Sequence, residues 1–180
     1  ESGKLNKYLV QELNTYVFRQ PEALMKNVVG VTNYMREYVE KNGGDVEREC
    51  LYVIPAKDGK PYYIDGENRF WRCYNFITNA HSCQSVENAE VFFNAAKAFG
   101  RFQNLLAEFD ATVLTESIKD FHNTPVRFQN LVNAINADKA GRVAECKEEI
   151  DFYLARKEFC SVITDRLADG RLPVRVTHND

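Results

Sequence analysis

The sequence predicts an α+β fold, in which a small antiparallel sheet with one helix precedes a mainly helical region. Short runs of β-branched and aromatic residues, separated by turn residues, occupy roughly the first 77 positions. Beyond position 84, apolar residues recur instead at the three- and four-residue spacing of helices. The chain has 180 residues, a length typical of one domain.

In the first part we expect one strand, one helix and then a three-stranded meander. The strand covers 8–13, and Pro21 opens the helix at a position where a first turn tolerates proline. The glycine pair at 43–44 ends this helix. Asp58-Gly59 predicts a hairpin turn within the meander. The three meander strands are expected at 51–54, 62–64 and 70–77.

In the second part we expect three helices and a final strand. Asn88 caps the first helix, whose apolar stripe we assign to the core. Thr124 and Pro125 open the second helix, and a long third helix lies between residues 141 and 170. Pro173 begins the last strand. The stripe of the first helix consists of Phe92, Ala95, Phe99, Phe102 and Leu106.

Composition and charge exclude several classes of protein. A formal net charge of −3 without a basic tract argues against binding to a nucleic-acid backbone. No run approaches the ~18 apolar residues that cross a bilayer. The five cysteines include no CxxC pair, so we expect reduced thiols in a cytoplasmic protein rather than disulfides or a zinc site.

The end of the sequence carries the clearest chemical signal, because the predicted last strand runs into Thr-His-Asn-Asp at 177–180. A carboxylate just beyond a strand end has a fixed backbone and an accessible side chain. Asp180 could therefore orient a hydroxyl and accept its proton as a phosphoryl group transfers. An aspartate after a strand is also a frequent turn former, so the tetrapeptide alone leaves both roles open.

The order of these parts is similar to that of protein-kinase-like proteins, and the His-x-Asp segment resembles that of the aminoglycoside-phosphotransferase superfamily. Six segments, spread over nearly the whole chain, carry a more specific resemblance: LVQELN at 9–14, VF at 17–18, PEALM at 21–25, AFGRFQ at 98–103, DFHNTP at 120–125 and VTHND at 176–180. In these segments the chain most resembles the N-acetylhexosamine 1-kinase branch of that superfamily.

This resemblance implies a two-lobed kinase that uses ATP and Mg²⁺. Residues 1–77 would form part of the small nucleotide-binding lobe, 78–84 the interlobe hinge, and 85–180 part of the helical lobe. The enzyme would phosphorylate a sugar hydroxyl, the anomeric one of an N-acetylhexosamine. Its partners would be ATP and a small sugar, with neither nucleic acid nor membrane, and the sequence does not indicate an oligomeric state.

The resemblance also implies roles for individual residues. Asp180 would be the catalytic base, and His178 would support the backbone of its loop. Adenine would bind at the end of the last meander strand, where a backbone edge offers a donor and an acceptor. The residues at that place are Phe76, Ile77 and Thr78. For the side chains of Phe76 and Ile77, simply finishing a core strand remains the alternative.

Two other positions matter for substrates. Kinases place a lysine on the strand before the first helix, where this chain has Gln11. Because glutamine brings no charge, neutralisation of the phosphates would fall more heavily on Mg²⁺. His122 and Asn123 could reach a sugar hydroxyl or acetamide, although Asn123 or Thr124 could instead only cap a helix. The neutral character of this segment favours a sugar acceptor over a cationic one.

Other parts of a kinase are not found in this sequence. No glycine-rich phosphate loop precedes Lys4, and no metal-binding Asn or Asp follows Asp180. We therefore expect an interior piece of a kinase that does not by itself turn over ATP. The alternatives are a kinase for another small acceptor, such as an aminoglycoside, choline or homoserine, and a non-catalytic pseudokinase-like binding module.

Overall fold

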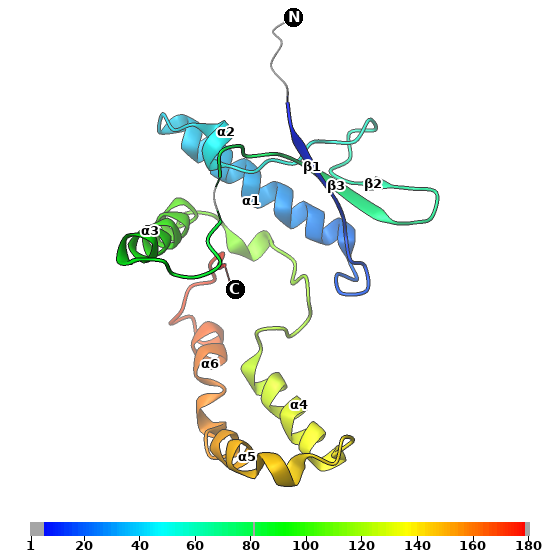
Figure 1. Ribbon diagram of the computed structural model, residues 1–180, viewed down its shortest axis with the longest axis vertical. Helices are drawn as coiled ribbons and strands as arrows, with labels where there is room; N and C mark the ends of the chain where they lie inside the picture. Colours follow the sequence, from blue (N-terminus) through cyan, green and yellow to red (C-terminus); the bar gives the residue numbers. More distant parts are fainter. Residues whose placement is uncertain (1–5, 81, 179–180) are drawn as a thin grey trace, which may run out of the picture. The chain divides into compact units, whose positions relative to one another are not determined.

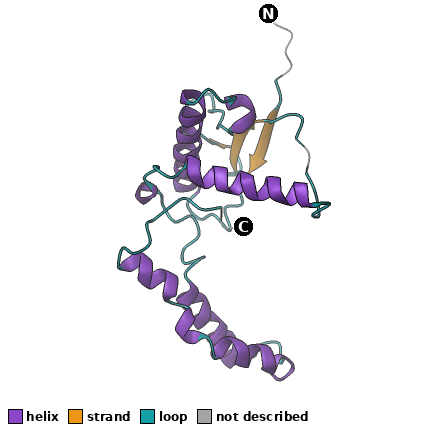
Figure 2. Ribbon diagram, turned by 90° about the vertical axis from the view of Figure 1, so that its left-hand side faces the viewer, coloured by secondary structure: helices purple, strands orange, loops and turns teal. Residues whose placement is uncertain are grey.

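The computed structural model describes residues 6–80 and 82–178 of the chain. It divides into two compact units, one formed by Glu1–Ser117 with Arg175–Asp180 and the other by Ile118–Val174. The fold is α+β, as predicted, with one small sheet and several helices (Figure 1), coloured orange and purple in Figure 2. The lobe boundary expected at 78–84 does not coincide with an edge of either unit, because the helix after it shares a core with the first helix.

The sheet of the first unit has three antiparallel strands in the order β1-β3-β2. They are β1 (Tyr8–Glu12), β2 (Tyr63–Ile64) and β3 (Phe70–Asn75). The register places Tyr8 opposite Asn75 and Gln11 opposite Arg72. Figure 1 shows β3 between the other two strands, so the last strand of the predicted meander is the centre of the sheet.

The predicted meander is wrong in one respect, since 51–54 does not form a strand in the described chain. Val53 makes only an isolated bridge with Tyr74, and the backbone N–H of Ile54 donates to the carbonyl of Cys73 at 2.8 Å. β1 occupies one edge of β3, so the Val53 segment and β2 share the other edge. The Asp58-Gly59 turn is present, but the segments on its two sides pair with β3 rather than with each other.

The first helix, α1 (Pro21–Lys41), follows the prediction closely. Pro21 stands in its first turn, and Gly43 adopts a φ of +71° just beyond its end. Its buried residues are Pro21, Met25 and Val39. A short helix that the sequence analysis missed, α2 (Val46–Glu49), follows it, and the side chain of Asp45 caps α2 through the backbone N–H of Glu47.

The core of the first unit lies where α1, Cys50 and the C-terminal end of α3 (Ala89–Leu105) meet. Asn88 caps α3 as predicted, by accepting a hydrogen bond from the N–H of Val91. The expected core stripe is only half correct, because Phe92 remains 63% exposed while Leu106 is 2% exposed. The buried cluster meets α3 at its C-terminal end alone. It consists of Val39, Cys50, Leu105 and Leu106.

The second unit contains α4 (Thr124–Ala137), α5 (Lys147–Leu154) and α6 (Val162–Ala168). The long helix predicted between residues 141 and 170 is therefore wrong. Two 3₁₀ segments, Val143–Cys146 and Lys157–Phe159, interrupt the α-helical hydrogen bonding there. A third 3₁₀ turn, Ala111–Val113, belongs to the first unit.

The final strand expected from Pro173 does not form within the described residues, where 173–178 has no strand assignment. Two apolar positions with a charged residue between them were too short a pattern to predict pairing, because a strand exists only with a partner edge. The segment is nevertheless docked, since Val176 packs against the core cluster of the first unit.

Candidate functional site

The end of β3 is held firmly by a buried asparagine. Asn75 is 7% exposed, and its Oδ1 accepts a hydrogen bond from the N–H of Tyr52 at 2.8 Å. Its Nδ2 donates to the carbonyl of Cys50 at 3.1 Å. Both contacts satisfy the buried amide, so the strand end before the predicted adenine-binding residues has a defined position.

Phe76, Ile77 and Thr78 follow this anchor directly. The N–H of Phe76 donates to the carbonyl of Lys7 at 3.1 Å, and the carbonyl of Thr78 accepts from the guanidinium of Arg48. Within the described chain, the N–H groups of Ile77 and Thr78 and the carbonyls of Phe76 and Ile77 have no protein partner. These groups form an open backbone edge.

The side chains at this edge differ in burial. Phe76 is 47% exposed, which argues against the alternative that its ring merely finishes a core strand. Ile77 is half-buried and Thr78 is exposed. An exposed ring beside an open backbone edge is suited to a planar heterocycle with its own donors and acceptors.

Gln11 lies on β1 and is tied to a cation across the sheet. Its Oε1 accepts hydrogen bonds from Nε of Arg72 at 3.0 Å and from Nη2 of Arg72 at 2.7 Å. The sequence analysis considered only the neutral glutamine, whereas the folded chain brings a positive charge to its side chain. The register pair Gln11–Arg72 lies four positions along β3 from Phe76, or about 13 Å at the rise of a strand.

Asp180, the predicted catalytic base, lies outside the described residues. Residues 175–178 are described and belong to the first unit. The ring of His178 meets the ring of Phe99 edge-on, with centroids 5.1 Å apart, and that of Phe102 at 6.4 Å. The segment that leads to Asp180 is therefore anchored to α3 through aromatic contacts.

The predicted sugar-binding residues, His122 and Asn123, belong to the second unit. Oδ1 of Asn123 accepts from the N–H of Val126 at 3.3 Å, and its Nδ2 donates to Oδ1 of Asp120 at 3.0 Å. Asn123 rather than Thr124 is thus the N-cap of α4, and the capping alternative holds for its amide. His122 is exposed and packs edge-on against Phe121, with ring centroids 4.8 Å apart.

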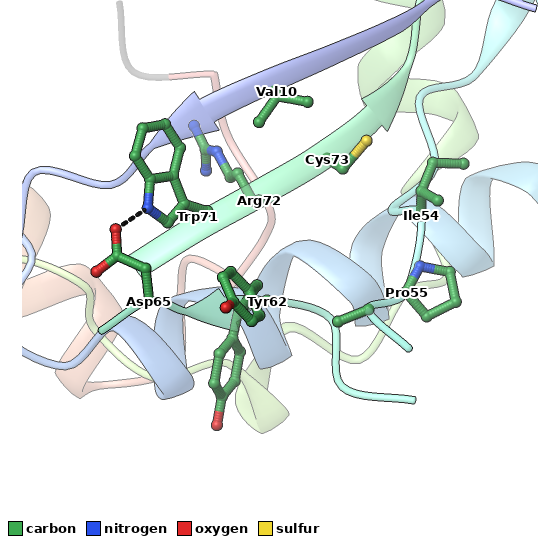
Figure 3. Close-up of a pocket in the computed structure, with 10 residues that line it drawn as sticks. Val10, Ile54, Pro55, Tyr62, Asp65, Trp71, Arg72 and Cys73 are labelled. Carbon is green, nitrogen blue, oxygen red and sulfur yellow. Dashed lines mark hydrogen bonds between the residues drawn. The ribbon is translucent and has the colours of Figure 1, made fainter. Parts of the chain in front are cut away.

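A cavity of about 470 Å³ lies on the sheet, and its lining includes Val10 and Arg72, which adjoin the predicted site residue Gln11. Figure 3 shows Asp65 at its rim, where it accepts a 2.9 Å hydrogen bond from Nε1 of Trp71. This bond, with further bonds from the backbone and side chain of Arg69, holds the pKa of Asp65 well below its usual range. Burial raises the pKa of the Cys73 thiol on the same wall. The sequence analysis missed this cavity, because it forms only when the turns pack beside β3.

Comparison with known families adds no assignment, since no protein-family model matches the chain. Among residues 6–80 and 82–178, no three His, Cys, Asp or Glu side chains gather in a way that could hold a metal ion. None of the helices in the described part of the chain combines the length and apolar character that crossing a membrane requires.

Proposed function

We propose that the protein is an ATP-dependent phosphotransferase that phosphorylates a sugar hydroxyl, the anomeric hydroxyl of an N-acetylhexosamine. The observation that carries this proposal is the open backbone edge at 76–78, which continues directly from an anchored strand of a small antiparallel sheet. The resemblance of six other segments to N-acetylhexosamine 1-kinases supports the choice of reaction. Such an enzyme uses ATP, so we place it in the cytoplasm.

The nucleotide would bind with its base at this edge. The N–H groups of Ile77 and Thr78 can donate to ring nitrogens of adenine, and the carbonyls of Phe76 and Ile77 can accept from its amino group. The exposed ring of Phe76 provides an apolar surface beside the base. The phosphates would then extend toward the side of β1 that carries Gln11.

The chemistry assigned to Asp180 follows from its His-x-Asp context in the sequence. Its carboxylate would accept the proton of the sugar hydroxyl, whose oxygen forms a bond to the γ-phosphorus of ATP. The bond between that phosphorus and the oxygen bridging to the β-phosphate breaks, and ADP leaves. Positioning of the two reactants supplies most of the rate enhancement.

Mg²⁺ offsets the charge of the phosphates when it accompanies ATP in such reactions. The residues of the described chain do not form a cluster suited to this ion. The proposal therefore gives none of them a metal-binding role.

The acceptor side is supported by the neutral polar residues His122, Asn123 and Thr124, which have the carboxylate of Asp120 beside them. The exposed imidazole of His122 can donate to or accept from a hydroxyl, whereas Asn123 is occupied in capping α4. A cationic acceptor such as choline or an aminoglycoside would call for several carboxylates. The neutral sugar is therefore the preferred acceptor, and the cationic compounds serve as comparisons in the test.

The test is transfer of phosphate by the protein expressed from its complete coding sequence. With MgATP and N-acetylglucosamine or N-acetylgalactosamine, we expect a sugar 1-phosphate and ADP in equal amounts by ³¹P NMR. Asp180→Asn should lower kcat by about 10²–10⁴-fold. Asp58→Asn, in an exposed turn, is the matched control and should remain active.

Two results would contradict the proposal. One is the absence of transfer to any sugar while MgATP is present. The other is an Asp180→Asn variant that is as active as the Asp58→Asn control. Phosphorylation of choline, homoserine or an aminoglycoside in place of the sugar would keep the phosphotransferase and replace its acceptor.

A further inference from the structure

Arg72 carries a charge that no acidic group of the described chain balances. Among residues 6–80 and 82–178, no carboxylate lies within ion-pair distance of its guanidinium. Arg69, three residues earlier, differs in this respect, because its Nε lies 2.8 Å from Oδ2 of Asp65. Arg72 is held instead by a neutral amide, so its full positive charge remains available.

The guanidinium of Arg72 is fixed on two sides. Oε1 of Gln11 accepts from both Nε and Nη2, at 3.0 and 2.7 Å. The ring of Tyr74, which is 7% exposed, lies 5.1 Å from the guanidinium carbon. A cation positioned in this way loses little side-chain entropy when it binds a ligand.

Hydrogen-bonding capacity remains after these contacts. A guanidinium has five N–H donors, and Gln11 takes only two of them. The remaining donors include both N–H groups of Nη1. Planar, doubly donating guanidinium groups match the oxygens of a phosphate.

We propose that Arg72 binds the phosphates of the nucleotide, and that Gln11 is the residue that positions it. The inference rests on the proposed function and adds the residue that supplies the charge. Gln11 stands where the resemblance expects a lysine, and the register places Arg72 directly opposite. The cation thus comes from β3 instead of β1.

The pairing explains why position 11 is neutral. Like charges directly opposite each other on neighbouring antiparallel strands are destabilising. A lysine at position 11 would face Arg72 across the ladder, whereas the amide oxygen of Gln11 binds it. Glutamine and arginine therefore form one phosphate-binding pair rather than two independent substitutions.

The competing explanation is that the pair only stabilises the sheet, and the experiment separates the two. In the protein expressed from its complete coding sequence, calorimetry compares the affinities of ATP and adenosine. For Arg72→Gln we expect the Kd of ATP to rise about 10- to 100-fold, the cost of losing charged hydrogen bonds, with that of adenosine unchanged. Arg72→Lys keeps the charge and should recover part of the ATP affinity.

Gln11→Glu provides a second variant in case Arg72→Gln fails to fold. Its carboxylate would neutralise the guanidinium without removing it, and should weaken ATP but not adenosine. Arg69→Gln, which breaks an ion pair in the turn just before β3, is the control and should leave the affinity for ATP unchanged.

The outcomes distinguish this inference from the function on which it rests. A wild-type protein that binds neither ATP nor adenosine would overturn both. If Arg72→Gln and Gln11→Glu bind ATP with the same affinity as the wild type, only the phosphate-binding role of Arg72 would be overturned. Equal losses of ATP and adenosine affinity in these variants would assign the pair to sheet stability and also overturn it.

Discussion

The guanidinium of Arg48 on α2 donates a hydrogen bond to the backbone carbonyl of Thr78, thirty residues further along the chain. The next side chain, Glu49, forms an ion pair with Arg101 on α3. The other carboxylate oxygen of Glu49 accepts from the N–H of Asp45 at 3.0 Å. A helix of only four residues therefore holds the backbone that follows β3 and also contacts α3.

Arg48→Ala should weaken nucleotide binding through Thr78, because the carbonyl loses the donor that fixes its direction. Loss of one hydrogen bond from a charged donor costs about 1.5–3 kcal/mol, so a rise of at least about tenfold in the KM for ATP is expected. The KM for the sugar should stay within about twofold. Steady-state kinetics with each substrate varied in turn provides the measurement.

Arg48→Lys is the variant that separates positioning from general stability. It keeps a charged donor and should restore most of the affinity for ATP. Equal changes in the KM values of ATP and sugar in Arg48→Ala would show that Arg48 does not act on the nucleotide edge.

Asn27 on α1 holds the backbone of Thr115 through both of its amide groups. Its Nδ2 donates to the carbonyl of Thr115 at 2.6 Å, and its Oδ1 accepts from the N–H of Thr115 at 3.0 Å. Asn27→Ala should therefore lower the free energy of unfolding by about 1–3 kcal/mol. Urea denaturation measures this change.

Asn133→Ala is the matched control for Asn27, since within the described residues the side chain of Asn133 hydrogen-bonds only to the exposed side chain of Gln129, at 3.0 Å. We expect its effect to stay within about 0.5 kcal/mol. A similar unfolding free energy for the two variants would mean that the two-way hydrogen bond contributes nothing to stability.

Asp65 should make the free energy of unfolding depend on pH in the acidic range. The hydrogen bond from Trp71, followed by those from the backbone and side chain of Arg69, lowers the pKa of Asp65 in the folded state. A carboxylate with a lowered folded pKa stabilises the protein above its unfolded pKa of about 4. That stability is lost as the pH falls below 4 toward the folded pKa.

Urea midpoints at pH 7 and pH 3 test this pH dependence. The urea midpoint of the wild type should be lower at pH 3 than at pH 7, and the decrease should be smaller for Asp65→Asn. Trp71→Phe, which removes the leading cause of the shift, should resemble Asp65→Asn. An Asp65→Asn variant with the pH dependence of the wild type would rule out this role.

The cysteines should differ strongly in reactivity toward a thiol reagent. Cys50 is 1% exposed, and burial is the main reason that its pKa is raised. Cys83 is exposed. In native protein we expect labelling of Cys83 within minutes and of Cys50 only after unfolding, followed by mass spectrometry of tryptic peptides. Rapid labelling of Cys50 in native protein would contradict the buried core described for it.

Local signals in the sequence predicted the elements whose ends they mark. Pro21 opened α1, Gly43 lay just beyond its end, and Asn88 capped α3. The predictions that were wrong concern elements whose formation depends on tertiary contacts. The break of the predicted long helix near Lys157–Phe159 has no Gly or Pro to announce it, and the pairing of Val53 with β3 depends on which edge is free.

In the candidate site, too, residues that meet only through tertiary contacts could not be predicted from the sequence. Gln11 was identified by its place before the first helix, but its partner Arg72 follows only from the register of β1 against β3. Arg72 could have been identified from the sequence only by pairing the two predicted strands in the correct register, which places Arg72 opposite Gln11. The strand end at 76–78 was predictable because it depends on chain order, whereas its anchor Asn75 is a tertiary contact.

Hydrogen–deuterium exchange with and without an ATP analogue is the most direct test of a nucleotide site at the end of β3. We expect slower exchange at the amides of Ile77 and Thr78 when the nucleotide is bound, with the Tyr62, Tyr63 and Asp65 part of the sheet-cavity lining unchanged. Unchanged exchange at Ile77 and Thr78 under saturating nucleotide, or protection confined to the cavity around Trp71, would contradict it.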